Sequence, residues 1–176
     1  MSQAEHGADS QSILLTTDRR IADLFPAEIE RQLDRLPRRE WVEKSLSHSS
    51  VVLLEREADL ADFVNAYAPE HLIAHRADAE EWASAIVNAG SVFLGYYTPE
   101  SAGDYASGTN HTLPTSGYAK SYSGVNLDSF TRKITFQQIS SEGLKNLGPV
   151  IEEMAEAERL EAHKEAVTVR LQSIHS

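Results

Sequence analysis

The sequence contains no cysteine, and this absence excludes disulfides and thiolate metal sites. Any metal ion held by this chain must therefore use imidazole, carboxylate or amide ligands. Long apolar runs are also missing, so the sequence predicts no membrane-spanning segment. Its opening residues do not have the pattern of a secretory signal peptide.

Basic residues are few relative to acidic ones. Lys and Arg number 16 against 27 Asp and Glu, which gives a net charge of −11. Such a chain repels nucleic acid and anionic membranes, so we expect a soluble, cytoplasmic protein that acts on a small molecule. The 176 residues, of which 41% are hydrophobic, suit one domain with a real core and at most a small appendage.

Short apolar runs alternate with helical patterns through the first part of the chain. Met1–Gly7 has the pattern of a last helical turn that stops at Gly7. In the next helices we expect a bend or restart at Pro26 and core positions for Trp41 and Leu46. The alternation predicts an α/β fold with a mainly parallel sheet and helices on both faces. The expected buried strands are 12–16, 50–54 and 91–94, a brief extended segment covers 71–73, and the expected helices are 18–36, 38–45, 60–67 and 79–89.

A long stretch from Gly90 to Ser123 begins as a strand and then continues as a glycine- and tyrosine-rich loop. A compact domain seldom carries so long a loop unless it is functional or disordered, and its aromatic residues disfavour disorder. Glycines allow close approach of the backbone to a ligand, while Asp104 and His111 supply an oxygen and a nitrogen donor. An ordinary turn-rich surface loop is the alternative interpretation.

The last part of the chain lacks enough apolar residues for a core of its own. We expect an edge strand or arm at 134–139 and helices at 141–158 and 161–173. Such an arm usually packs on a partner, most often a second copy of the same chain. The sequence therefore predicts an α/β domain over residues 1–130 and a dimerisation arm over residues 131–176.

Several polar pairs have spacings that suit a site. Gln3 and His6 lie three apart on one side of a helical turn, although a solvated helix end explains them equally well. Glu70 and His71 point to opposite sides of an extended segment and so suit two different proton-transfer steps, although a buried histidine bonded to a carbonyl is the plainer interpretation. Two further residues, Glu158 and His163, flank the break between the last helices, where solvent exposure is the default. Spacing alone selects no reaction.

Taken together, these segments resemble histidinol dehydrogenase, a family that completes histidine biosynthesis. The resemblance covers nearly the whole chain in the family's order, and its longest string is too long for chance. The matching segments are Gln3-Ala-Glu-His6, Ala68-Pro-Glu-His-Leu72, Ala89-Gly-Ser-Val-Phe-Leu94, Ser101-Ala-Gly-Asp-Tyr-Ala-Ser-Gly-Thr-Asn-His-Thr-Leu-Pro114 and Leu160-Glu-Ala-His-Lys-Glu-Ala-Val167.

The resemblance implies a zinc-containing enzyme that oxidises L-histidinol, through the aldehyde, to L-histidine with two NAD. It implies that His71 is the base and that Glu70 activates the water that attacks the aldehyde. It also implies a homodimer in which the arm crosses over, so that His163 serves the neighbouring subunit. The implied zinc ligands are Gln3, His6, Asp104 and His163, and the implied substrate contacts are these four together with His71, His111 and Glu158.

The chain departs from the family in length. Family members are much longer, and the missing N-terminal portion carries the nucleotide-binding domain. No G-x-G-x-x-G fingerprint lies between a strand and a helix here, so we expect no NAD-binding residues in this chain. The resemblance thus implies an incomplete Rossmann-like, three-layer α/β domain followed by a two-helix arm. We expect a truncated reading of a longer gene, half of a split gene or a shortened piece, with little or no activity alone.

Two other functions fit the same residues. The chain would be a non-catalytic zinc- or imidazole-binding module that dimerises through its arm, or a zinc hydrolase in which Glu70 activates water. A hydrolase would need no NAD, which separates it from the dehydrogenase.

Overall fold

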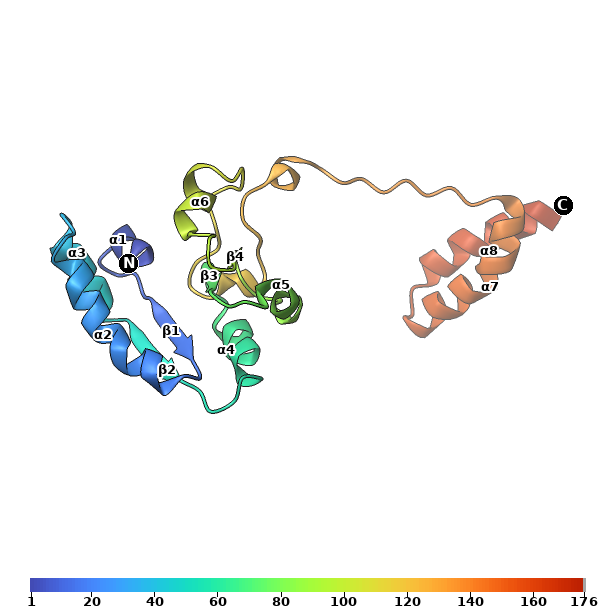
Figure 1. The fold of residues 1–176 in the computed structure, drawn as a ribbon. Helices are drawn as coiled ribbons and strands as arrows, with labels where there is room; N and C mark the ends of the chain where they lie inside the picture. The colour runs from blue at the N-terminus through green and yellow to red at the C-terminus, as the bar shows by residue number, and fades with distance from the viewer. Residues whose placement is uncertain (176) are drawn as a thin grey trace. The chain divides into compact units, whose positions relative to one another are not determined.

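The computed structural model describes residues 1–175 and contains two compact units. The first unit is Met1–Thr131, and the second begins at Arg132 (Figure 1). No helix among the described residues is both long enough and apolar enough to cross a membrane.

The first sheet joins two parallel strands, β1 (Ile13–Thr16) and β2 (Ser50–Leu53). The helices α2 (Arg19–Leu33) and α3 (Arg39–Leu46) connect them. Asp18 begins α2 by accepting a hydrogen bond from the Arg20 backbone N–H at 2.8 Å. Hydrogen bonds from the side chain and backbone of Arg20 lower the pKa of the Asp18 carboxyl to about 2. The α2 helix runs through Pro26 without restarting, and it ends at Leu33 rather than at residue 36.

A small core formed with α2 and α3 holds the first helix, α1 (Ser2–His6), in place. Ala4 and Val42 are fully buried, and Leu33 is nearly so. Leu46 packs partly against this core as expected, but the prediction for Trp41 was wrong, because 49% of this residue is exposed. Successive helical residues are turned by roughly 100°, and it is Val42, the next residue, that faces inward. The Trp41 ring lies instead beneath the Arg38 guanidinium, 5.6 Å from its centroid.

The second sheet also has two parallel strands, β3 (His71–Ala74) and β4 (Ser91–Leu94). It follows α4 (Asp59–Tyr67), and its strands are linked by α5 (Ala79–Trp82) and the short 3-10 helix η1 (Ala83–Ala85). The helix expected up to residue 89 therefore ends early. The Asn65 side chain accepts from the backbone N–H of Val87 at 2.8 Å and donates to the Ala85 carbonyl at 2.9 Å. These bonds occupy backbone groups that a longer helix would have paired internally.

The prediction of an α/β fold with parallel strand pairing is confirmed. The described residues form two separate two-stranded sheets rather than one larger sheet. The strand expected at 50–54 was predicted to be buried. This was wrong, because Val51 and Leu53 are 38% and 41% exposed. A run of apolar residues predicts burial only when another layer covers both of its faces.

The long loop contains one helix that the sequence did not reveal, α6 (Glu100–Tyr105). Gly103 packs it directly against β4, because a Cβ at this position would lie 2.8 Å from the Phe93 ring. Two short 3-10 helices follow in the same unit, η2 (Tyr118–Lys120) and η3 (Leu127–Phe130).

The second unit is a helical hairpin of α7 (Ser141–Ala157) and α8 (Glu161–His175). Arg159 adopts a left-handed conformation at the turn, with φ of 59°, and Lys164 joins the helices through an ion pair with Glu156 at 2.7 Å. The segment 134–139 has neither helix nor strand geometry and is exposed throughout. The edge strand, one of the two forms expected there, is not formed in the described structure.

Replacing Leu33 by alanine tests the small core that holds α1. We expect Leu33→Ala to lower the free energy of unfolding by about 2–5 kcal/mol, because it leaves a cavity beside Ala4 and Val42. Leu24→Ala on the same helix is the control, since Leu24 is 69% exposed and should change stability by no more than about 0.5 kcal/mol. Urea unfolding followed by circular dichroism measures both, and equal losses would contradict this description of the core.

Gly103→Val tests the close packing of α6 on β4. A side chain at this position must displace the Phe93 ring, so we expect a loss of about 1–3 kcal/mol in thermal or urea unfolding. The matched control is Ser101→Val, which places the same side chain at an exposed position of the same helix. Unchanged stability of Gly103→Val would show that α6 does not rest on Phe93.

Candidate metal and proton-transfer site

Three segments of the first unit bring their polar side chains together. The first helix, α1, contributes Gln3 and His6, and the start of β3 supplies His71 directly after Glu70. Hydrogen bonds join these residues to one another and to α6. Residues far apart in the sequence therefore form one polar cluster.

His71 lies at the centre of this cluster with 4% of its side chain exposed. Its Nδ1 atom lies 2.8 Å from Gln3 Oε1 and 3.9 Å from one carboxylate oxygen each of Glu70 and Glu100. Its Nε2 atom is buried without a hydrogen-bond partner among the described residues. Buried polar atoms without a partner are rare in native proteins, so this atom is a candidate point of contact for a ligand.

Glu100 was missed by sequence reasoning, although it is one of the most buried residues of the chain, with 2% exposed. Its carboxylate lies 3.0 Å from His6 Nε2 and accepts a hydrogen bond from the Ser2 hydroxyl. Glu100 and Asp104 are four residues apart on α6 and so lie on one face of it. That spacing would have suggested the pair, had a helix been expected inside the loop.

The ligand atoms of His6, Glu100 and Asp104 all lie within 4.8 Å of one another. Nitrogen and carboxylate oxygen are donors that Zn²⁺ accepts, and no thiolate is needed. The donor set therefore fits a divalent metal ion. Gln3, another expected ligand, lies beside this group through its contact with His71.

The remaining expected site residues are exposed. His111 is exposed on the loop after α6. Glu158 and His163 belong to the second unit, at the end of α7 and the start of α8, and both are exposed. Their roles stay predictions.

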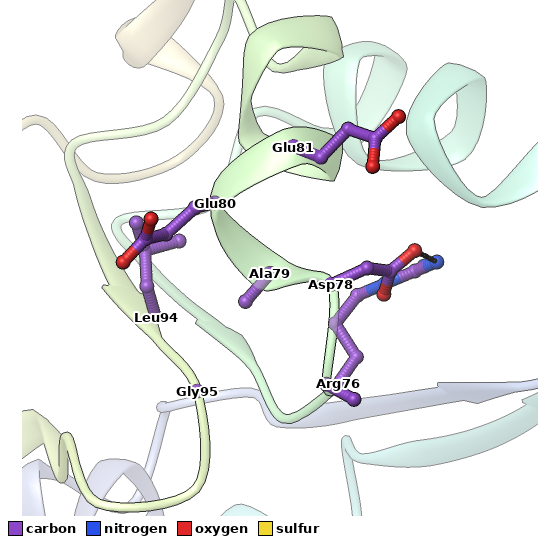
Figure 2. A pocket seen from close by; sticks show the side chains of 8 residues that line it. Arg76, Asp78, Ala79, Glu80, Glu81, Leu94 and Gly95 are labelled. Carbon is purple, nitrogen blue, oxygen red and sulfur yellow. Dashed lines mark hydrogen bonds and ion pairs between the residues drawn. The ribbon is translucent and has the colours of Figure 1, made fainter.

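Two shallow pockets lie in the first unit, and neither is lined by a residue of the cluster. One of about 370 Å³ lies at the carboxyl ends of β3 and β4. Figure 2 shows that Arg76 is engaged with Asp78 there, and it also pairs with Glu57 at 2.6 Å. Its guanidinium is thus already neutralised, which leaves an acidic wall. The other, of about 620 Å³, is lined by residues of β4 and the following loops, including Ser91, Asn110 and Phe130.

Comparison with known proteins gives consistent matches. A family model described as Histidinol dehydrogenase matches residues 1–171. The histidinol dehydrogenase of Bacteroides thetaiotaomicron is 59% identical over 174 residues, which cover 99% of this chain and 41% of that protein. The chloroplastic histidinol dehydrogenase of Arabidopsis thaliana is 53% identical over 177 residues, which cover 100% of this chain and 38% of that protein.

A solved structure is similar as well. The crystal structure of histidinol dehydrogenase from Elizabethkingia anophelis superposes with a TM-score of 0.91 at 56% identity, over 99% of this chain and 40% of that one. This chain therefore spans about two fifths of the length of these relatives. The resemblance seen in the motifs is confirmed, and the chain belongs to the histidinol dehydrogenase family.

Proposed function

We propose that this chain carries the metal and proton-transfer part of a histidinol dehydrogenase. The reaction is the NAD-dependent, four-electron oxidation of L-histidinol through L-histidinal to L-histidine. The observation that supports it is the convergence of Gln3, His6, Glu70, His71 and Asp104 on one cluster, with a buried imidazole nitrogen left unpaired.

The proposed zinc ligands are Gln3, His6, Asp104 and His163. When bound, zinc supplies a fixed positive charge that orients the substrate and has no redox role. His6 and Asp104 are already gathered with Glu100, so these two proposed ligands need little rearrangement to hold the ion. Preorganisation of this kind lowers the entropic cost of binding.

The proposed proton chemistry belongs to His71 and Glu70. An alcohol oxidation needs a base near neutral pH, and imidazole is the side chain suited to that task. Glu70 would activate the water that attacks the aldehyde stage, and its side chain, 24% exposed, is open enough for water to reach it. His111 and Glu158 would contact the substrate.

The proposed partner is a second copy of the chain, with exchange of the C-terminal arm. The hairpin leaves Leu147, Val150 and Met154 between 50% and 61% exposed, which is costly for large apolar side chains in water. In this arrangement His163 would join the site of the neighbouring subunit. A cytoplasmic location is part of the same proposal.

A non-catalytic zinc- or imidazole-binding module is the second candidate. It is favoured by one observation, since the cluster is assembled without any nucleotide-binding element in this chain. The test is to add the remaining part of the enzyme to this chain. Binding of zinc and histidinol without turnover in that mixture would support the module.

Calorimetry with zinc tests the metal site. Loss of a residue that only hydrogen-bonds to a metal ligand lowers metal affinity roughly 10–100-fold. We expect His6→Ala and Asp104→Asn, each of which removes a proposed ligand, to weaken zinc binding by more than that. His48→Ala is the control, because this exposed histidine lies on the turn after α3, outside the cluster. Equal affinity in all four proteins would refute the proposed ligands.

The assay for activity is the absorbance of reduced nicotinamide after addition of histidinol, zinc and NAD. We expect the 176-residue chain alone to show turnover that is absent or very weak, because its sequence offers no dinucleotide fingerprint. Turnover near the roughly 1–1,000 per second of ordinary enzymes would contradict this expectation. A longer relative measured in parallel serves as the positive control.

A further inference from the structure

The first unit is built from two halves, each with its own sheet. Residues 1–54 contain β1 and β2, residues 59–131 contain β3 and β4, and residues 55–58 connect them. Helix α1 packs with α2 and α3 in the first half, whereas Gly103 packs α6 on β4 in the second half. The proposed ligands His6 and Asp104 therefore come from different halves, and their separation depends on how the halves are held together.

At the amino end of β3 the two halves meet through the polar cluster, where Gln3 lies 2.8 Å from His71. A single point of contact leaves two bodies free to pivot about it. A second contact at the other end of β3, roughly 15 Å away at the rise of an extended strand, fixes the angle between them.

Arg76 supplies this second contact just after β3 ends. Its Nε and Nη2 atoms donate to the two carboxylate oxygens of Asp78 at 2.6 and 2.8 Å, and this forked pairing fixes the plane of the guanidinium (Figure 2). Its Nη1 atom lies 2.6 Å from Glu57 Oε1 on the connecting segment. Glu57 Oε2 in turn accepts a hydrogen bond at 3.2 Å from the hydroxyl of Thr17, directly after β1. The carboxyl ends of β1 and β3, one from each half, are thus joined through Arg76 and Glu57.

The Arg76 junction is better shielded from water than the other arginine ion pairs. The Arg76 side chain is 22% exposed, whereas the other arginines that form ion pairs among the described residues are 46–87% exposed. Its guanidinium also lies over the Trp82 ring, 5.0 Å from the centroid. Shielded charges are screened less by salt, and charge networks contribute more than isolated surface pairs. A hydrogen bond from Tyr67 to Gln11 also joins the halves, but it is exposed to solvent.

We infer that Arg76 is a positioning residue, whose junction with Glu57 fixes the angle between the two halves. In this way it holds His6 and Asp104 at the spacing that a metal ion needs. Arg76 lies at the far end of β3 from the cluster and acts through this strand. The consequence for zinc rests on the proposed function, whereas the effect on the angle depends only on this chain's own residues.

Distances between spin labels test the angle without any metal. The chain has no cysteine, so Leu24→Cys on α2 and Ser101→Cys on α6, both at exposed positions, place one label on each half. Pulsed electron spin resonance on the 176-residue chain, after removal of metal by a chelator, gives the distribution of label distances. We expect Arg76→Gln and Glu57→Gln each to broaden this distribution, because the halves lose their second contact.

Arg31→Gln is the matched control, because Arg31 pairs with Glu28 inside α2 and so within one half. It should leave the distribution unchanged, and circular dichroism confirms that each variant is folded. An unchanged distribution in either folded Arg76→Gln or folded Glu57→Gln would overturn the inference, whether or not the chain binds zinc.

Calorimetry with zinc separates positioning from a general loss of stability. We expect Arg76→Gln to weaken zinc binding roughly 2–30-fold, the range for residues that act on a site from outside it. Saturating zinc should also narrow the broadened distance distribution, because the ion joins ligands of both halves. Wild-type zinc affinity in folded Arg76→Gln would overturn the positioning role. Failure of the wild-type chain to bind zinc would instead refute the proposed metal site, and the label distances would still decide whether Arg76 fixes the angle.

Discussion

The buried carboxylate of Glu100 is the constraint on which the arrangement of the site depends. Burying a carboxylate without partners costs free energy. The hydrogen bonds of Glu100 with Ser2 and His6 therefore hold α1 and α6 against each other. These partners lie 98 and 94 residues earlier in the chain. A helix of five residues such as α1 is not stable alone in water. It is held on one side by this polar contact and on the other by Ala4, which fits into the small core.

Glycine completes the same arrangement from the side of the second sheet. A Cβ at Gly90 would lie 2.6 Å from the Glu70 carbonyl oxygen, so only glycine lets β4 pair so closely with the segment before His71. In many α/β proteins ligands bind at the carboxyl ends of the strands. Here the polar cluster lies at the amino end of β3, because helices α1 and α6 bring their side chains to that end. The pocket at the carboxyl ends is instead lined by acidic residues around a neutralised Arg76.

Local pattern was sufficient for much of the fold but not for its contacts. The strands were predictable as short apolar runs, and helical spacing alone indicated that Gln3 and His6 lie on one side of the first helix. The depth of burial could not be predicted in this way, as Trp41 and Leu53 show. Burial depends on which layers lie against each face of an element. The early end of the helix before Val87 was also hidden, since Asn65 causes it from more than twenty residues away. Glu100 escaped notice for a similar reason, because its importance comes from partners almost a hundred residues distant.

The charge balance of the cluster explains why a metal suits it. Glu70, Glu100 and Asp104 bring three carboxylates into one small region, and among residues 1–175 the ion pairs of Glu70 and Glu100 are with imidazoles rather than with Lys or Arg. Neutral imidazole compensates such charge only by hydrogen bonding, so a divalent cation would stabilise the carboxylates far more. A metal at His6 and Asp104, as proposed, would therefore be compatible with His71 acting as a base nearby.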